Sequence, residues 1–425
     1  MPFDWIPGCG LAAGIARSGP TNCATLRPMT ATTDRTPPAL RDSVAQISAD
    51  AVALRRDIHQ HAELSTEEHR TQGVIIDRLN AAGISHVRPC ADTGATALVR
   101  GALPGPNLLW RADIDALPLR EETGLPFASE NGAMHACGHD GHIAIAVAMA
   151  ELLHQSRESL RGTVRFAFQP AEEHVGGAQR MIREGILDEP RVDRVFGLHL
   201  WASTPLGDAL VKPGPVFAAA THFRIIIRGH GGHAAAPHET VDPIVVAAHA
   251  IVALQTVVSR SVDPAETVVL SVGRIQGGVR GNIIPNECWM TGTIRTYEDQ
   301  VLKRVLRRVE EILGGVTAAW GGEYQLDHST LGACVNDEAA AATVAEAAAG
   351  LLGASHVGPG QATGADDMNL FLEARPGAYF MLGAQPRREG RVYPHHHSRF
   401  DFDEGAIPIG IELGLRVLES AGAQA

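Results

Sequence analysis

The chain has 425 residues and a formal net charge of −12, from 36 Lys and Arg against 48 Asp and Glu. Apolar residues make up 45% and charged residues 20%, as in soluble globular proteins and unlike disordered ones. An acidic chain without a Lys/Arg cluster is a poor nucleic-acid binder, and no uninterrupted apolar run approaches the ~20 residues of a membrane helix. We therefore expect a globular protein of about two to three domains that binds neither nucleic acid nor membranes.

The positions of cysteine and histidine matter for function, because both side chains can ligate metal ions. The six cysteines contain no CxxC pair, which predicts free thiols in a reducing compartment, here the cytoplasm; they are Cys9, Cys23, Cys90, Cys137, Cys288 and Cys334. The chain also has 20 histidines. The question for function is whether some of them converge.

The first 39 residues differ from the rest of the chain. Residues 1–39 are rich in Gly, Pro, Thr and Ala and show no sustained period. A secretory signal would begin with basic residues and continue with ~7–15 apolar ones, whereas Asp4 comes first and the apolar stretch at 11–16 is short. We expect a disordered tail, or an upstream start codon with initiation near Met29.

From residue 40 the pattern is that of an α/β domain. Apolar residues at alternating gaps of three and four predict a helix over 44–58, and a second helix over 70–82 ends at Gly83. Strands and helices then alternate, with strands expected at 107–111, 163–168, 192–198 and 378–382, and helices at 143–153, 176–184 and from 407. This alternation predicts a mainly parallel sheet covered by helices on both faces.

Residues 219–336 follow a different rhythm. Their order is strand, helix, strand, strand, helix, strand, which is the split βαβ order of a ferredoxin-like α+β domain. We expect this segment to be inserted into a larger domain formed by residues 40–218 and 337–425.

Acidic residues follow the predicted strands of the larger domain. Asp113 and Asp115 come after the first strand, although turn and capping roles explain many such aspartates. Glu172 and Glu173 come after the second, where one carboxylate could ligate metal while the other transfers protons; the alternative is a solvated acidic turn. Ligands of open α/β sheets bind beyond the carboxyl ends of the strands, so this recurrence indicates one site.

Metal-competent residues are concentrated in residues 135–142, HACGHDGH. Cys137 and His139 are spaced to reach one divalent ion from a tight loop, whereas His142 lies one turn further and could cap or orient instead. His199 ends the third predicted strand. A lone histidine at such a position is often a packed core residue. His199, however, lies at a strand end as the acidic candidates do, and this position favours a role as a metal ligand.

Two more polar clusters lie elsewhere. A triple-histidine run comprises His395, His396 and His397. The inserted segment contains His233 among glycines, together with Asn282 and Arg295. An arginine on a strand suits an anionic substrate, because a guanidinium binds a carboxylate bidentately.

Together these motifs resemble the metal-dependent amidohydrolases that include hippurate hydrolase, bacterial N-acyl-amino-acid aminoacylases and plant auxin-conjugate hydrolases. The motifs are RADIDALP, MHACGHDGH, FQPAEE, GLHLW, GHGGHAAAPH and HHHSRFDFDE, in order from about residue 40 to the C-terminus. The resemblance implies a catalytic domain with two divalent ions, of zinc, manganese, cobalt or nickel, and a lid domain through which the chain forms a homodimer.

The resemblance also implies roles for single residues. The family's metal ligands match Cys137, His139, Glu173 and His199, and counting back from Phe400 selects His396 as the fifth, with His395 and His397 still open.

Glu172 matches the general base, and Asp113 matches a carboxylate that orients a ligand. His233 matches a lid histidine that reaches the partner subunit's oxyanion, while Asn282 and Arg295 match residues that hold the substrate's carboxylate.

The expected reaction is hydrolysis of the amide bond of N-acyl amino acids. The alternatives are N-acetyl-diaminopimelate deacetylation, a dipeptidase, and a non-catalytic metal-dependent binder of small molecules. Two departures from the family pattern are Arg111, where distant two-metal peptidases have a histidine, and Gly364-Ala-Asp-Asp-Met368, where relatives often have Gly-x-Glu-Asp-Phe.

Overall fold

The structure is a computed structural model that describes residues 38–174, 176–386 and 392–423. The tail expected over residues 1–39 therefore lies outside the described residues as far as residue 37. The cysteines of the described chain, Cys90, Cys137, Cys288 and Cys334, are all buried free thiols.

The larger sheet has eight strands in the order β1-β2-β4-β3-β5-β16-β6-β15. Its central strands β4, β3, β5 and β16 pair in parallel, and the antiparallel pairs are β1 with β2, β2 with β4, and β16 with β6. The bounds are β1 Val87–Cys90, β2 Gly94–Arg100, β3 Leu103–Asp113, β4 Arg161–Gln169, β5 Arg194–Trp201, β6 Ala209–Leu210, β15 Val357–Gly358 and β16 Gly377–Gly383. The mainly parallel sheet is confirmed.

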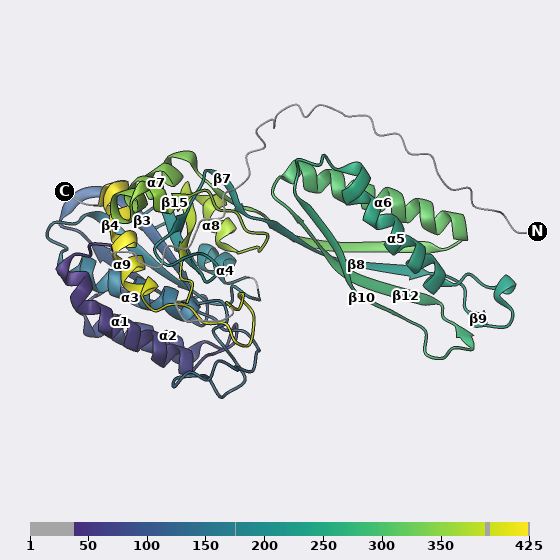
Figure 1. Ribbon diagram of the computed structural model, residues 1–425, viewed down its shortest axis with the longest axis horizontal. Coiled ribbons are helices and arrows are strands. Elements are labelled where there is room, and N and C mark those ends of the chain that lie inside the picture. Colours follow the sequence, from purple (N-terminus) through teal and green to yellow (C-terminus); the bar gives the residue numbers. More distant parts are fainter. Residues whose placement is uncertain (1–37, 175, 387–391, 424–425) are drawn as a thin grey trace, which may run out of the picture. The chain divides into compact units, whose positions relative to one another are not determined.

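Helices cover both faces of this sheet (Figure 1). One apolar core lies under α1 Asp42–Gln60, α2 His69–Ala81, α3 His139–Gln155, α7 Glu338–Leu352 and α9 Ala406–Leu418. A second core, on the other face, includes residues of α4 Gly177–Arg183 and α8 Met368–Ala374. Helix α3 is buried from His139 to Leu153, so its apolar residues lie on all sides and its first turn is held rigidly beside the strand ends.

The second sheet has four antiparallel strands in the order β10-β12-β8-β13. The strands are β8 Ala219–Arg228, β10 Val268–Gly277, β12 Glu287–Thr296 and β13 Glu323–Leu331, and the helices α5 Pro243–Ser261 and α6 Asp299–Trp320 pack together on one face (Figure 1). Numbered along the segment the order is 2-3-1-4, as the ferredoxin-like arrangement requires. The apolar core of this second sheet is separate from the two cores of the large sheet. The boundaries of a distinct domain at residues 219 and 336 stay a prediction.

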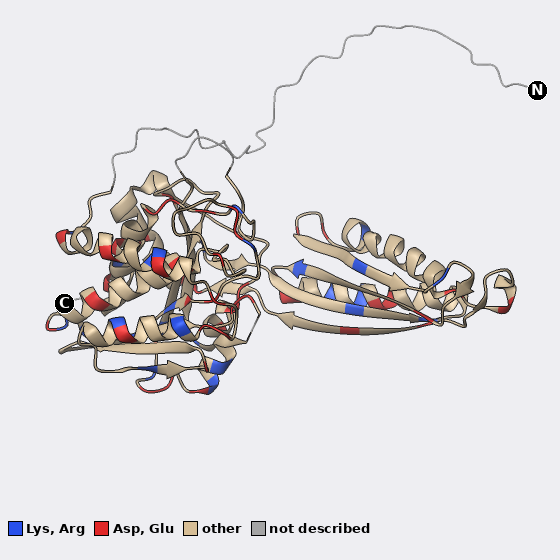
Figure 2. Cartoon of the chain, turned by 90° about the horizontal axis from the view of Figure 1, so that it is seen from below, with Lys and Arg blue, Asp and Glu red and all other residues tan. Residues whose placement is uncertain are grey.

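Helix α5 is the one helix of the described chain that is long and apolar enough to cross a membrane, with a mean hydropathy of 1.5. Core helices of soluble proteins pass the same test, so a single such helix is weak evidence. Its inner face packs on the sheet through Val246, Ala250 and Leu254, whereas Ile244 and Val252 are exposed. The exposed apolar face of α5 was not predicted from the sequence, because His249 interrupts the run of apolar residues in this helix. Basic and acidic residues are interspersed over the described chain (Figure 2).

Candidate metal centre

The predicted strand-end residues meet at one edge of the large sheet. They line a cavity of about 590 Å³ that includes Cys137, Glu172, Glu173, His199 and His396. Glycines shape the local backbone: Gly138, with φ +91°, is the N-cap that precedes α3, and a Cβ at Gly141 would lie 2.5 Å from Leu200. Glycine at both positions lets the loop turn tightly and approach β5 closely.

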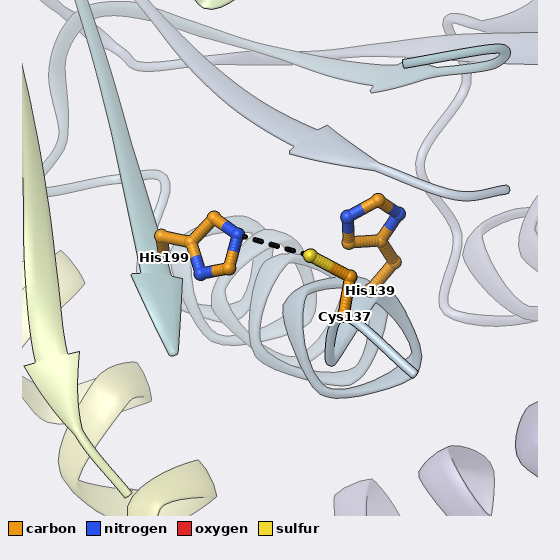
Figure 3. A group of neighbouring side chains, drawn as sticks. All are labelled: Cys137, His139 and His199. Carbon is orange, nitrogen blue, oxygen red and sulfur yellow. Dashed lines mark hydrogen bonds between the residues drawn. The ribbon is translucent and has the colours of Figure 1, made fainter. Parts of the chain in front are cut away.

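Cys137, His139 and His199 form one candidate ligand set, with their donor atoms within 4.8 Å of one another (Figure 3). Sγ of Cys137 lies 3.5 Å from Nε2 of His199. Each imidazole is oriented by its other nitrogen, because Nδ1 of His139 donates to the carbonyl of Asp115 at 2.9 Å and Nδ1 of His199 donates to that of Leu200 at 2.8 Å. Both Nε2 atoms are thus left to face the centre.

Cys137, Glu173 and His396 form a second set that shares the thiol. Oε1 of Glu173 lies 3.2 Å from Nε2 of His396. The amide of Glu173 donates to Oδ2 of Asp115 at 3.0 Å, so Asp115 positions both this carboxylate and His139. The two sets could therefore hold two ions around Cys137.

The triple-histidine run divides into three different environments. His395 donates from Nε2 to the carbonyl of Leu200 at 3.0 Å, and Nδ1 of His397 accepts from the amide of Arg399 at 3.0 Å. His396 alone of the three joins a candidate ligand set in the described chain, and its backbone has the unusual φ of +65°. This geometry favours His396 over the two alternatives, and its role as a ligand stays a prediction.

Glu172 lies between the candidate metal ligands and a second group of carboxylates. It belongs to one cluster with His139 and Glu173 and to another with Asp366 and Asp367. Burial raises the pKa of Glu172 well above its usual value, and the neighbouring carboxylates raise it further. Ala171, with φ +52°, makes the turn that places Glu172 at the cavity.

Asp113 is buried beneath the candidate ligands. Its Oδ1 accepts from Nδ1 of His142 at 2.5 Å, and Nε2 of His142 accepts from the amide of Leu200 at 2.9 Å. Oδ2 of Asp113 lies 3.6 Å from Nε2 of His139. His142 therefore orients Asp113 and β5, which is the second of the two roles that its sequence position left open.

Asp366 and Asp367, which precede α8, form a carboxylate pair that the sequence pattern did not predict to lie at the site. Both lie within ion-pair distance of the buried Arg111, at 3.0 and 3.2 Å. The available signal was Arg111 itself, because a charged residue inside an apolar strand needs buried partners. In the sequence, the pair stands out only as part of the departure of residues 364–368 from the family pattern.

The residues of the inserted segment lie in two places. Arg295 lines the cavity together with His222 and Ser329. His233 and Asn282 are exposed and do not line it. His233 ends the short strand β9 Gly232–His233, which pairs with β11 Ile283–Ile284, and Asn282 directly precedes β11. The amide of Ala234 donates to the carbonyl of Asn282. The structure therefore brings Arg295 to the strand-end residues and leaves His233 and Asn282 apart.

The chemistry of these groups fits divalent metal ions. Burial raises the pKa of the Cys137 thiol well above its usual value, as do the charges of Glu173 and Glu172, whereas burial lowers the pKa of His199 and keeps it a neutral donor. The buried Nε2 of His139 has no hydrogen-bond partner in the described chain. A cation here would favour the thiolate and balance the crowded carboxylates, and a mixed S, N and O set suits borderline ions such as zinc.

Comparison with known proteins agrees with this chemistry. The profile of peptidase family M20/M25/M40 matches residues 109–420. The chain belongs to this family. It is 38% identical over 375 residues to N-acetylcysteine deacetylase of Bacillus subtilis (strain 168), covering 87% of this chain and 97% of that one.

Two further relatives extend the comparison. The N-acyl-L-amino acid amidohydrolase of Geobacillus stearothermophilus is 41% identical over 284 residues, covering 66% of this chain and 76% of that one. The YXEP protein of Bacillus subtilis, whose structure is described as a dinuclear metal binding peptidase, has a TM-score of 0.76 and 33% identity, covering 88% and 98% of the two chains. The predicted family is confirmed, and the predicted amide hydrolysis agrees with these names.

Proposed function

We propose that this chain hydrolyses the amide bond of N-acyl amino acids and releases a carboxylic acid and a free amino acid. The observation that carries the proposal is a single cavity in which candidate metal ligands, the carboxylate of Glu172 and the guanidinium of Arg295 are all present. The names of the deacetylase and amidohydrolase relatives support this substrate class.

Five residues of the chain would hold two divalent ions, zinc, manganese, cobalt or nickel: Cys137, His139, Glu173, His199 and His396. When bound, such ions polarise the acyl carbonyl and lower the pKa of water. The backbone carbonyl of Asp115 keeps the imidazole of His139 in orientation, and Asp113 lies beside the same imidazole, so that this ligand is arranged before an ion binds.

Glu172 performs the proton transfers. Its carboxylate accepts the proton of the attacking water and later delivers it to the nitrogen of the leaving amino acid. The position supports this role, because Glu172 lines the cavity and lies beside Glu173 and His139. Such a general base contributes about 10²–10⁴-fold to the rate.

Arg295 holds the substrate's carboxylate. Its Nη1 donates to Thr293 Oγ1 and to the carbonyl of Ile294, while no carboxylate of the described chain lies within ion-pair distance. A guanidinium placed in this way can bind an anion bidentately. This arrangement favours amino-acid substrates over neutral amides.

The chain acts as a homodimer, and the second sheet with its helices is the lid. Two observations support this: His233 and Asn282 do not line the cavity of their own chain, and α5 exposes Ile244 and Val252. A second copy that covers this apolar face would place His233 at the oxyanion of its neighbour, with Asn282 at the substrate. The buried free thiols suit a cytoplasmic location.

The proposal is tested by hydrolysis assays with hippurate and N-acetyl amino acids, with Mn²⁺, Co²⁺ or Zn²⁺ added and with a chelator as the control. We expect turnover that depends on the metal. N-acetyl-diaminopimelate and unblocked dipeptides form two further arms, and preferential hydrolysis of either would establish that alternative. A non-catalytic binder would turn over none of these substrates with any metal, and this result would refute the proposal.

A further inference from the structure

A second cavity of about 630 Å³ lies at the β1-β2-β4 edge of the large sheet. It shares no lining residue with the metal centre. Arg88, Arg100 and Arg165 line it, together with Thr96. The concentration of three guanidinium groups in one hollow is unexpected in a chain with a net charge of −12.

The sheet register places these side chains on one face. Arg88 pairs directly with Thr96, and Leu98 pairs with Arg165. Because residues directly opposite each other, and residues two apart on one strand, share a face, Thr96 and Arg100 of β2 lie on the same side as Arg88 and Arg165. The strands therefore direct all three arginines to the same side of the sheet.

The arginines lack acidic partners. In the described chain no carboxylate lies within ion-pair distance of Arg88, Arg100 or Arg165; Arg88 donates to the carbonyl of Pro89, and Arg165 donates to that of Glu189. Three carboxylates, Glu184, Asp188 and Glu189, also line the cavity and balance its formal charge, and the charge of Asp188 raises the pKa of Arg165, but none of them lies within ion-pair distance of these arginines. The three guanidinium groups are therefore left without a direct acidic partner in the described chain.

Two buried polar atoms in the cavity wall also have no partner. Arg165 and Thr96 are only 5% and 2% exposed, yet Nε of Arg165 and Oγ1 of Thr96 make no hydrogen bond in the described chain. Burial lowers the pKa of Arg165, and the charges of Arg88 and Arg100 lower it further, so the three groups repel one another. Unpaired buried donors cost free energy that a ligand would recover.

We propose that this cavity is an anion-binding site for the phosphate or carboxylate groups of a small molecule, separate from the metal centre. Guanidinium groups bind both anions through pairs of charge-assisted hydrogen bonds, and the Thr96 hydroxyl offers one more donor. A bound anion would remove the repulsion between the arginines.

The test is calorimetric titration of the metal-loaded protein with inorganic phosphate, citrate and acetate. We expect saturable binding of phosphate or citrate, about tenfold weaker in the double variant Arg88→Ala/Arg100→Ala, since charge-assisted hydrogen bonds are lost. Stronger binding of phosphate would identify a phosphate ester as the ligand class, and stronger binding of citrate a polycarboxylate. Arg161→Ala is the matched control, because Arg161 is an exposed arginine of β4 outside the cavity.

The metal centre could also bind phosphate, but that binding would not change in the double variant. Absence of saturable binding of both anions, equal affinity in the double variant, or equal weakening by Arg161→Ala would overturn the proposal. Thr96→Val provides a second check, because it should weaken anion binding while leaving the melting temperature unchanged or higher.

Discussion

Nη1 of Arg111 donates a hydrogen bond to Oδ2 of Asp113 at 2.7 Å, and both side chains are almost completely buried. The same guanidinium contacts Asp366 and Asp367. Burial alone would raise the pKa of Asp113, but the charges of Arg111, His139 and His142 together outweigh it and hold the pKa well below its usual value. Arg111 makes the largest of these contributions, which keep the carboxylate beneath the candidate ligands ionised.

Replacement of this arginine should destabilise the fold. In Arg111→Met we expect the free energy of unfolding to fall by about 3–5 kcal/mol, because buried carboxylates lose their cation. Urea unfolding followed by circular dichroism measures the change. The exposed Arg183→Met is the control and should remain within about 0.5 kcal/mol of the parent protein. A loss as small as that of the control would show that Arg111 does not stabilise the carboxylates.

The adjacent glutamates should separate catalysis from metal binding. We expect Glu172→Gln to lower kcat by about 10²–10⁴-fold with its metal content unchanged, because only the proton acceptor is lost. Glu173→Gln should lose metal, since it removes a candidate ligand beside His396.

Metal analysis after gel filtration, together with steady-state kinetics, distinguishes the two variants. Loss of metal in Glu172→Gln, with metal retained in Glu173→Gln, would mean that the two roles are exchanged.

The triple-histidine run provides a matched comparison within three residues. We expect His396→Ala to weaken binding of one of the two ions about 10–100-fold. His397→Ala should bind metal like the parent protein, because His397 contacts Tyr393 and Arg399 instead. Titration with a chromophoric chelator measures both affinities. Normal binding in His396→Ala would assign the fifth ligand to another residue.

The sequence predicted those parts of the fold that have a strong local signal. Apolar periodicity located α1, α3 and the central strands, but it did not predict β1 or the two-residue strand β6. β1 contains Pro89 and is half exposed, so it has no apolar alternation, and its pairing with β2 is set by tertiary packing.

The residues of the site likewise divide into those that a local sequence signal predicts and those that only tertiary packing brings together. Glu173 and His199 could be found because they lie at strand ends, where the topology brings side chains together. Cys137 and His139 could be found from the concentration of metal-competent residues over 135–142, and His396 only through the resemblance to the family. The proximity of Glu172 to Asp366, whose carboxylate oxygens lie within 4.8 Å of each other, could not be predicted in this way, since Asp366 lies in the loop before α8 and not at the end of a predicted strand. Likewise, the separation of His233 from the cavity could not be predicted, because it depends on how the second sheet is placed.

Stability at low pH should depend on Glu412 of α9. Burial alone would raise its pKa, but hydrogen bonds from Arg416 at 2.7 Å and Arg41 at 3.1 Å hold the pKa below its ordinary value of 4.5. A lowered pKa contributes stability above pH 4.5, and this contribution is lost as the pH falls through the folded-state pKa.

Unfolding of Glu412→Gln measured across pH tests this linkage. We expect a deficit of about 1–3 kcal/mol at neutral pH, because charge-assisted hydrogen bonds are lost, and a smaller deficit below pH ~4. Glu158→Gln, at a position where the side chain is 82% exposed, should show no such pH-dependent deficit. A deficit for Glu412→Gln that is constant with pH would contradict the linkage.

His233 is exposed and does not line the metal-centre cavity of its own chain. We therefore predict that each active site of the proposed dimer contains residues of both subunits. Glu172→Gln and His233→Ala should each be nearly inactive as pure proteins. If His233 serves the partner subunit, a mixed dimer of the two variants contains one centre with an intact Glu172 and an intact His233 from the other chain. Refolding an equal mixture should then restore about a quarter of the parent activity, because about half of the dimers are mixed and half of their centres are complete.

The control is a mixture of Glu172→Gln with Cys137→Ser. Because Glu172 and Cys137 both belong to the centre of their own chain, each centre of a mixed dimer carries one of the two changes and none is complete. Recovery in the first mixture alone requires a histidine supplied from the partner, whereas no recovery in purified mixed dimers would place His233 at its own centre.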